Sequence, residues 1–312
     1  MGIKDFYNIA IPNNKTIKDL GTLITLKNLA GMRIAIDGNL IAYQCMTAIS
    51  SDKALTDGDG KITQHLLISL NKIIAMNLMG IHQLWIFDNP IPNPRKAETH
   101  KQRKEHREKY SGNRLRLSSE HYDEIKQLLE YLGIPYVIAP SGVEGEQFGA
   151  WLTYGELQDE RICQYILSAD ADVLLFEGNV IRQYTEGVKG NKKTKLALFE
   201  YNRLISELDM SKDDLCKMAM VMGHDFGAPV RGTAKGTVYK KVKAKQFDSL
   251  FNEPEKQEEL SQYYMEPSDY IDDAEYHYNE SYRPEELIEW LNSRGFNKNI
   301  LLKRLSKYKH IC

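Results

Sequence analysis

The stretch "YILSADADVLLFEG" (165–178) sets two aspartates, Asp170 and Asp172, between two apolar runs. The first run, 165–167, is typical of the end of a buried strand, and the second, 173–176, follows at once. The stretch itself contains no Lys or Arg that could neutralise the pair. Two carboxylates placed at the end of a buried strand repel each other, so they indicate either a solvated turn or a bound cation.

Four short apolar runs in the first half of the chain predict buried strands. They are "MRIAID" (32–37), "QLWIFD" (83–88), "IPYVIA" (134–139) and "CQYILSAD" (163–170). Segments with helical spacing separate them, at 62–80, 118–133 and 140–157. This strand–helix–strand repetition predicts an α/β fold with a mostly parallel central sheet flanked by helices.

The strand pattern fades after about residue 200. Residues 211–223 predict a helix that begins after Ser211, and a glycine-containing segment with a basic helix follows it. The acidic stretch 252–282 is rich in Tyr, Glu and Asp and is expected to be a long, partly ordered loop. Residues 283–308 predict two closing helices.

Acidic residues follow all four predicted strands. They are Asp37, Asp88, the pair Glu144 and Glu146, and the pair Asp170 and Asp172. Taken singly, each could be a helix N-cap or a turn residue. Taken together, six carboxylates would converge on one edge of a parallel sheet and would need divalent cations to offset their repulsion. Oxygen ligands alone suit Mg²⁺ or Mn²⁺ rather than zinc, and two such ions form a clamp for displacement at phosphorus.

The composition narrows the class of protein. The 312 residues are 42% hydrophobic and 27% charged, an ordinary globular balance. The sequence contains no run of about 18 apolar residues, so no membrane-spanning helix is expected. The N-terminus lacks the pattern of a secretory signal. The four cysteines show no C-x-x-C spacing, which favours a reducing compartment and argues against a zinc cluster. We therefore expect an intracellular protein that is not secreted and has no membrane partner.

The net charge of −2 hides an uneven distribution. Residues 94–116 hold nine Lys and Arg against three Glu, whereas residues 252–287 hold twelve Asp and Glu against two Lys and Arg. A basic segment on an otherwise acidic protein favours a face that binds a polyanion. Two solvated charged surfaces are the alternative.

These motifs, taken in order, resemble the flap endonuclease and XPG-type family of structure-specific nucleases. The resemblance rests on "MGIKDFY" at the start, "IAIDGNLIAYQC" and "LWIFDNPIPNPRKAETHKQR" at the first two strands, "LGIPYVIAPSGVEGEQFGA" at the glutamate pair, "LSADADVLLFEG" at the aspartate pair, and "VMGHDFGAPVRGTAKGTVYK" beyond them. It covers nearly the whole chain. It implies a PIN-like 5′ nuclease fold with a C-terminal helix–two-turn–helix region and a shortened helical gateway.

The resemblance also implies an organisation of the chain. A nuclease core would cover residues 1–200 and include the basic gateway at 92–120. A C-terminal region over 201–312 would carry the helix–two-turn–helix and the acidic loop 252–282, and both parts would form one compact unit.

The family's functional residues carry over position by position. The metal ligands, direct or through water, would be Asp37, Asp88, Glu144, Glu146, Asp170, Asp172 and Asp225. Lys96 and Arg103, seven residues apart, would form the basic pair of the gateway that stabilises the scissile phosphate, with Arg95 as a competing match for the first position. The implied DNA contacts are Gly2, Tyr43 (the base-stacking aromatic, or alternatively a core residue), Arg95, Gly232, Lys235, Gly236, Lys240 and Lys241.

Three features depart from the family pattern. The upper gateway is short, which weakens the preference for a threaded 5′ flap and keeps junction cleavage open. The hairpin "RGTAKG" replaces a tighter glycine turn, and Pro229 stands where a hydroxyl usually helps to bind potassium, so a K⁺ site there is uncertain. No glutamine-plus-aromatic motif for a sliding clamp follows the last predicted helix, so clamp binding is not supported.

The resemblance implies a nuclease that uses two Mg²⁺ ions, with Mn²⁺ as an acceptable substitute. It would be a monomer that cuts branched or nicked duplex DNA with a 5′ single-stranded end, as a 5′-flap endonuclease with 5′→3′ exonuclease activity. Its place would be the nucleus or another compartment where DNA is replicated, repaired or recombined. The alternatives are a junction or bubble endonuclease of the Holliday type, a catalytically inactive DNA-binding relative, and an RNA nuclease of the related PIN-type fold.

Overall fold

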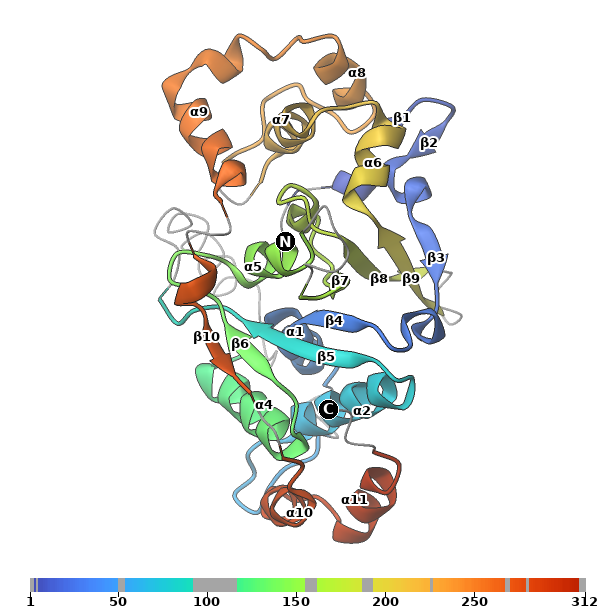
Figure 1. The fold of residues 1–312 in the computed structure, drawn as a ribbon, viewed down its shortest axis with the longest axis vertical. Helices are drawn as coiled ribbons and strands as arrows, with labels where there is room; N and C mark the ends of the chain where they lie inside the picture. Colours follow the sequence, from blue (N-terminus) through green and yellow to red (C-terminus); the bar gives the residue numbers. More distant parts are fainter. Residues whose placement is uncertain are drawn as a thin grey trace.

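A mixed sheet crosses the middle of the molecule, with helices above and below it (Figure 1). The computed structural model describes residues 3, 5–49, 54–91, 117–154, 162–186, 193–224, 227–266, 270–278 and 281–308. Within these residues the sheet has eight strands in the order β10-β6-β5-β4-β7-β8-β9-β3. A separate two-stranded sheet joins β1 (Ala10–Ile11) to β2 (Lys15–Thr16).

The four predicted strands form the parallel centre of this sheet. They are β4 (Arg33–Asp37), β5 (His82–Phe87), β6 (Tyr136–Ile138) and β7 (Tyr165–Leu167). Strand β4 pairs with β5 on one side and with β7 on the other, and β5 pairs with β6, all in parallel. The carboxyl ends of all four strands therefore meet at one edge, as the sequence predicts.

Four further strands complete the sheet, and the sequence patterns did not indicate them. Strand β8 (Val180–Glu186) lies parallel to β7, and β9 (Lys193–Phe199) and β3 (Thr22–Ile24) follow in antiparallel pairing. Strand β10 (Glu275–His277) pairs antiparallel with β6 at the opposite edge. Short 3₁₀ turns lie between the longer elements, at η1 (Phe6–Asn8), η2 (Ile17–Leu20), η3 (Leu26–Leu29), η7 (Asp172–Leu174), η8 (Leu250–Asn252), η9 (Gln262–Tyr264) and η11 (Ile271–Asp273).

Each face of the sheet carries its own apolar cluster and its own helices (Figure 1). The lower face packs against α1 (Gly38–Thr47), α2 (Gln64–Leu78), α4 (Ser119–Leu132), α10 (Pro284–Asn292) and α11 (Lys298–Leu305). The upper face packs against α5 (Gly145–Leu152), α6 (Tyr201–Leu208), α7 (Lys212–Met222) and α8 (Val238–Lys243). This is the predicted arrangement of a mostly parallel sheet flanked by helices.

The helix ends carry the signals that the sequence contains. Gly133 follows α4 with φ +67°, the left-handed conformation that glycine adopts at low cost. Ser211 precedes α7 and its side chain accepts a hydrogen bond of 3.1 Å from the amide of Asp214. None of the described helices is long and apolar enough to cross a bilayer.

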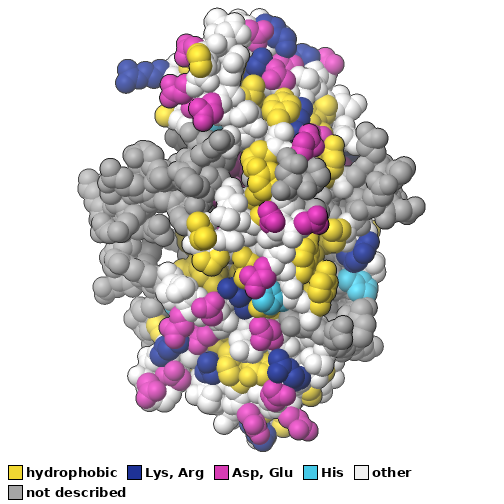
Figure 2. All heavy atoms as spheres, turned by 60° about the vertical axis from the view of Figure 1, so that its left-hand side comes forward, with side chains coloured by type: hydrophobic (Ala, Val, Ile, Leu, Met, Phe, Trp, Pro, Cys, Tyr) yellow, Lys and Arg dark blue, Asp and Glu magenta, His cyan; other side chains and the backbone are white. Residues whose placement is uncertain are grey.

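The acidic stretch 252–282 is the place where the expectation of a long loop was wrong. Residues Pro254–Ser261 form helix α9, and the stretch also contributes strand β10 to the main sheet. Aromatic side chains hold it in place, since Tyr270 stacks on Trp151 of α5 with ring centroids 5.7 Å apart. On the face that includes α9 and β10, Asp and Glu side chains lie among apolar ones (Figure 2). A net negative charge did not prevent ordering, because the tyrosines between the acidic residues supply apolar contacts.

Gly38, directly after Asp37, lies where the start of α1 approaches β5 closely. A Cβ at this position would lie 2.7 Å from the carbonyl oxygen of Ile86 and 2.6 Å from a ring carbon of Phe87. We expect Gly38→Ala to lower the free energy of unfolding by about 1–3 kcal/mol in a denaturant titration, because both neighbours are buried. Gly58→Ala is the matched control, since nothing lies within 4 Å of its Cβ, and an equal loss there would contradict the packing explanation.

Candidate active site

The carboxyl ends of β4 and β5 supply the first two carboxylates of the site. Asp37 ends β4 and caps α1, where its Oδ1 accepts a hydrogen bond of 2.8 Å from the amide of Leu40. Asp88 follows β5, and its Oδ1 accepts a hydrogen bond of 2.7 Å from the amide of Gly145. The side-chain amide of Asn39 also donates to Asp88. Asp88 is thus oriented by the starts of two helices, α1 and α5.

The glutamate pair lies at the N-terminus of α5. Glu144 is the N-cap residue and Glu146 lies in the first turn. The positive end of the helix dipole partly offsets the repulsion between these two carboxylates and Asp88. Gly145 between them allows the close approach, since a Cβ there would lie 3.0 Å from Asp88 Oδ1.

The aspartate pair occupies the turn that joins β7 to η7. A chain of hydrogen bonds runs through it: the amide of Asp172 donates to Asp170 Oδ1 (3.2 Å), and the amide of Asp170 donates to Ser168 Oγ (3.1 Å). Ser168 Oγ in turn donates to Asp37 Oδ2 (3.0 Å). Asp172 is 2% exposed, so at least one of the two carboxylates is withdrawn from bulk water.

Five of the predicted ligands form two overlapping groups. Asp88, Glu144 and Glu146 can each offer an oxygen such that all three atoms lie within 4.8 Å of one another, and the same holds for Glu146, Asp170 and Asp172. Opposite ligands of an octahedral Mg²⁺ lie about 4.2 Å apart, so each group approaches the size of a site for one such ion. Glu146 is the residue that the two groups share. Asp37 lies beside them and is bonded to the aspartate turn through Ser168.

The electrostatic environment of Asp37 reflects this crowding. Burial, together with the nearby negative charges of Asp88 and Asp170, raises the pKa of Asp37 from 3.8 to about 7. The hydrogen bonds from Leu40 and Ser168 favour the charged form but do not outweigh burial. A carboxyl in this environment holds a proton near neutral pH unless a cation replaces it.

Comparison with known proteins identifies the family. A model of the XPG N-terminal domain matches residues 1–110, and a model of the XPG I-region matches residues 133–225. Flap endonuclease 1 from Glycine max is 27% identical over 99% of this chain and 87% of its own length. The structure of flap endonuclease-1 from Methanococcus jannaschii superposes with a TM-score of 0.71 and is 25% identical in sequence. The match covers 92% of this chain and 94% of that one. The chain belongs to the flap endonuclease and XPG-type nuclease family.

The similarity extends to other branches of the family at the level of the fold. A structure of the Holliday junction-resolving enzyme GEN1, in complex with product DNA and Mg²⁺, has a TM-score of 0.62 and is 16% identical, over 93% of this chain and 76% of that one. Further flap endonuclease 1 relatives match this chain over 57–64% of their own length. The fold is therefore the PIN-like fold of the flap endonucleases, as the resemblance implies.

Several residues that the family pattern singles out lie outside the described part of the chain. They are the gateway residues Arg95, Lys96 and Arg103, the N-terminal Gly2 and the seventh carboxylate, Asp225. Tyr43 is described: it lies on α1 and its side chain is 49% exposed. The alternative reading of Tyr43 as a core aromatic does not fit this exposure.

The hairpin expected to meet DNA backbone forms an exposed loop between α7 and α8. Gly232 has φ +78°, and Gly236 has open space around it. Lys241 Nζ donates to the carbonyl of Gly232 at 3.4 Å, while Lys235 and Lys240 are exposed. The carbonyl of Lys235 accepts a hydrogen bond of 2.8 Å from the amide of Ala10, so this loop lies beside the N-terminal segment.

Sequence reasoning missed a network around His224, the residue that precedes Asp225 in the chain. The backbone amides and carbonyls of His224 and Gly227 pair in both directions, at 3.1 and 3.3 Å. The buried ring of His224 bonds to the hydroxyl of Tyr263 through Nδ1 (2.8 Å) and to Glu259 Oε2 through Nε2 (3.3 Å). Tyr263 and Glu259 belong to the acidic stretch, so no local pattern around His224 could have revealed them.

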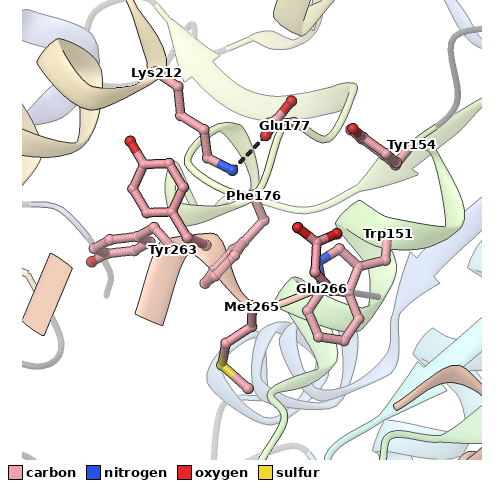
Figure 3. A pocket seen from close by; sticks show the side chains of 9 residues that line it. Trp151, Tyr154, Phe176, Glu177, Lys212, Tyr263, Met265 and Glu266 are labelled. Atoms are coloured by element: carbon pink, nitrogen blue, oxygen red, sulfur yellow. Dashed lines mark hydrogen bonds and ion pairs between the residues drawn. The ribbon is translucent and has the colours of Figure 1, made fainter. Parts of the chain in front are cut away.

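A pocket of about 140 Å³ lies at the other end of α5 from the carboxylates (Figure 3). Aromatic side chains line it, among them Trp151, Phe176 and Tyr263, and an ion pair joins Lys212 to Glu177 at its rim. No metal-ligating carboxylate of the two groups lines this pocket. The pocket lies where the acidic stretch packs against α5 and α7.

The raised pKa of Asp37 predicts how the metal-free protein responds to pH. The folded state keeps the proton up to about pH 7, whereas an unfolded aspartate loses it near pH 4. The contribution of Asp37 to stability is therefore present below about pH 4 and is lost as pH rises through 7, by at most about 4 kcal/mol.

Asp37→Asn removes this titration while Asn still accepts the bond from Leu40. In EDTA, we expect the variant to gain stability relative to the wild type as pH rises from 4 to 8, measured by denaturant unfolding. Curves that stay parallel over this range would contradict a raised pKa at Asp37.

Proposed function

We propose that this protein is a metal-dependent, structure-specific DNA nuclease, acting as a 5′-flap endonuclease with 5′→3′ exonuclease activity. One observation carries the proposal: two groups of carboxylates, with Glu146 in common, converge at the carboxyl edge of the parallel strands. Membership of the flap endonuclease and XPG-type family supports the substrate class. The complete set of described carboxylates argues against a catalytically inactive relative.

The donor set fits two divalent cations. Asp88, Glu144 and Glu146 would hold one ion, and Glu146, Asp170 and Asp172 the other. All donors are carboxylate oxygens, which suit Mg²⁺ and also Mn²⁺. When bound, the two ions supply an activated water for attack at phosphorus and stabilisation of the leaving oxygen. Asp225, which follows His224 in the chain, would complete the ligand set, and Asp37 would act from β4, directly or through water.

The remaining residues would bind and orient DNA. Lys96 and Arg103 of the gateway, with Arg95 beside them, would draw in and stabilise the scissile phosphate. Tyr43, exposed on α1, would stack on a base next to it. The loop that carries Gly232 and Lys235 would contact duplex phosphates, which sets position without reading sequence. The N-terminal segment lies beside this loop, which is consistent with a DNA contact near Gly2.

We infer that the protein acts as a monomer on branched or nicked duplex DNA with a 5′ single-stranded end, in the nucleus or another compartment where DNA is replicated. The alternative is cleavage of four-way junctions. The short upper gateway favours this alternative, because less chain is available to enclose a threaded 5′ strand. Similarity to the fold of a junction-resolving enzyme is compatible with it.

A cleavage panel tests both the chemistry and the substrate. Labelled 5′-flap, gapped, four-way-junction and single-stranded RNA substrates would be incubated with Mg²⁺ or with EDTA. We expect the 5′ flap to be cut fastest and EDTA to abolish cleavage. Preferential cutting of the junction would replace the flap assignment by the alternative, and cleavage that survives EDTA would overturn the two-metal proposal.

Because both carboxylate groups contain Glu146, its substitution should slow cleavage more than substitution of Glu144 in the same assay. Glu146→Gln weakens both groups, so we expect a loss of at least about a hundredfold in cleavage rate. Glu144→Gln weakens one group, and we expect a smaller loss that added Mn²⁺ partly restores. Equal losses, with no rescue of Glu144→Gln, would contradict the sharing of Glu146.

The network around His224 predicts a positioning role for Tyr263. Tyr263→Phe removes the hydroxyl that bonds to the ring of His224, the residue that precedes the proposed ligand Asp225 in the chain. We expect the Mg²⁺ concentration for half-maximal cleavage to rise by about tenfold, with near-normal cleavage at saturating Mg²⁺. Tyr264→Phe is the control, because Tyr264 is a neighbouring tyrosine that forms no described bond to His224. An unchanged Mg²⁺ requirement in Tyr263→Phe would remove this role.

A further inference from the structure

Arg182 lies in the same row of the sheet as two residues of the carboxylate site. Ile36 of β4 pairs with Leu167 of β7, and Leu167 pairs with Ile181 of β8. The next position along each strand is Asp37, Ser168 and Arg182, respectively, and the amide of Ser168 donates to the carbonyl of Ile181 at 3.2 Å. With neighbouring strands about 4.8 Å apart, the backbone of Arg182 is about 10 Å from that of Asp37.

Arg182 also shares its face of the sheet with the carboxylates. Val180 belongs to the upper apolar cluster and Ile181 to the lower one, so the alternation of a strand directs Arg182 to the upper face. On β4 the same alternation places Ala35 in the upper cluster and directs Asp37 to that face. The side chain of Arg182 therefore lies on the same face of the sheet as Asp37, at the edge where the carboxylates converge.

Two tyrosines hold the guanidinium of Arg182. Its central carbon lies 3.9 Å from the ring centroid of Tyr7 and 5.4 Å from that of Tyr184. Tyr7 is 6% exposed and packs in the upper cluster, so it is a fixed platform. Burial, and then the charges of Asp170 and Asp172, raise the pKa of Tyr7, while Arg182 opposes them. The stacked pair thus lies within the field of the aspartate turn.

The hydrogen-bonding groups of Arg182 have no acidic partner among the described residues. The ion pairs found in that part of the chain engage other arginines, such as Arg203 with Glu207 at 2.6 Å, but not Arg182. Stacking occupies the flat face of a guanidinium and leaves the N–H groups at its edge available. Phosphate oxygens are the ligands that such an edge binds in a bidentate manner. Arg182 remains partly exposed, so a ligand can reach it.

We propose that Arg182 is a phosphate-binding residue that contacts a backbone phosphate of the substrate strand next to the one that is cut. The inference rests on the proposed nuclease function and adds a cation on the β8 side of the carboxylates, on the sheet itself. Tyr7 is the positioning residue that presents the guanidinium. The competing explanation is that Arg182 only offsets the charge of Asp170 and Asp172 within the protein.

Binding of 5′-flap DNA in EDTA tests the proposal without cleavage or metal. Fluorescence anisotropy at several salt concentrations would compare the wild type with Arg182→Ala and Arg182→Lys. We expect Arg182→Ala to bind about tenfold more weakly and to reduce the slope of log affinity against log salt by about 1. Arg182→Lys keeps the charge but loses the planar fork, so its affinity should fall between the two.

Arg203→Ala is the matched control, since this arginine is satisfied by Glu207 and by Thr22 Oγ1 at 2.6 Å. It should bind DNA like the wild type. Two substitutions of Tyr7 distinguish the contribution of its ring from that of its hydroxyl. Tyr7→Phe should bind normally, because the Tyr7 hydroxyl bonds to none of the described residues, whereas Tyr7→Leu should lose about as much affinity as Arg182→Ala.

Single methylphosphonate substitutions locate the contact. A neutral linkage at the contacted phosphate should weaken the wild type about tenfold and leave Arg182→Ala almost unchanged. A normal affinity and salt slope in Arg182→Ala, or additive losses at every phosphate, would overturn the proposal in favour of an internal counterion. A wild type that binds DNA normally but does not cut it with Mg²⁺ would refute the nuclease function and leave this contact standing. A wild type that binds no branched DNA would refute both.

Discussion

The mutual repulsion of carboxylates at the carboxyl edge of four parallel strands is the constraint on which the site depends. Parallel pairing of β4, β5, β6 and β7 brings the acidic residues after each strand to one place. The fold lowers the cost with the N-terminus of α5, with backbone amides such as that of Gly145, and with a retained proton at Asp37. These contributions offset only part of the repulsion. Under the proposed function, bound divalent cations would offset the rest.

The sequence predicted the parts of this arrangement that depend on short-range patterns. Apolar runs ending in acidic residues gave the four central strands, and the parallel α/β class then implied that Asp88, Glu146 and Asp170 meet. Strand β8 was missed, although it has alternating positions, because its side chains face two different apolar clusters. Among residues 180–184, whose side chains the structure describes, only Val180 and Ile181 are fully buried. Arg182 was missed with it, since its place beside Asp37 follows from strand register rather than from spacing.

The acidic stretch shows a different limit of sequence reasoning. Its acidic composition indicated a loop, yet its aromatic side chains pack on distant elements. Tyr270 packs on α5, His277 on β6 and Tyr263 on His224. Such contacts join segments that are far apart in the chain, and neither partner carries a local signal of them. Burial of aromatic rings can outweigh the solvation of a charged stretch when the charges remain at the surface, as they do on this face (Figure 2).

An acidic protein that binds a polyanion must confine its positive charge to the path of the ligand. Under the proposed function, the gateway sequence and the exposed lysines beside Gly232 would attract DNA, while the acidic residues elsewhere in the chain would limit unproductive association. Arg182 adds a cation on the sheet itself, stacked on Tyr7. A cation stacked on a buried tyrosine cannot follow a moving strand as a lysine on a flexible stem can. Its value would be in fixing where the backbone passes the carboxylates, so that the position of the cut depends on the rigid sheet rather than on the surrounding loops.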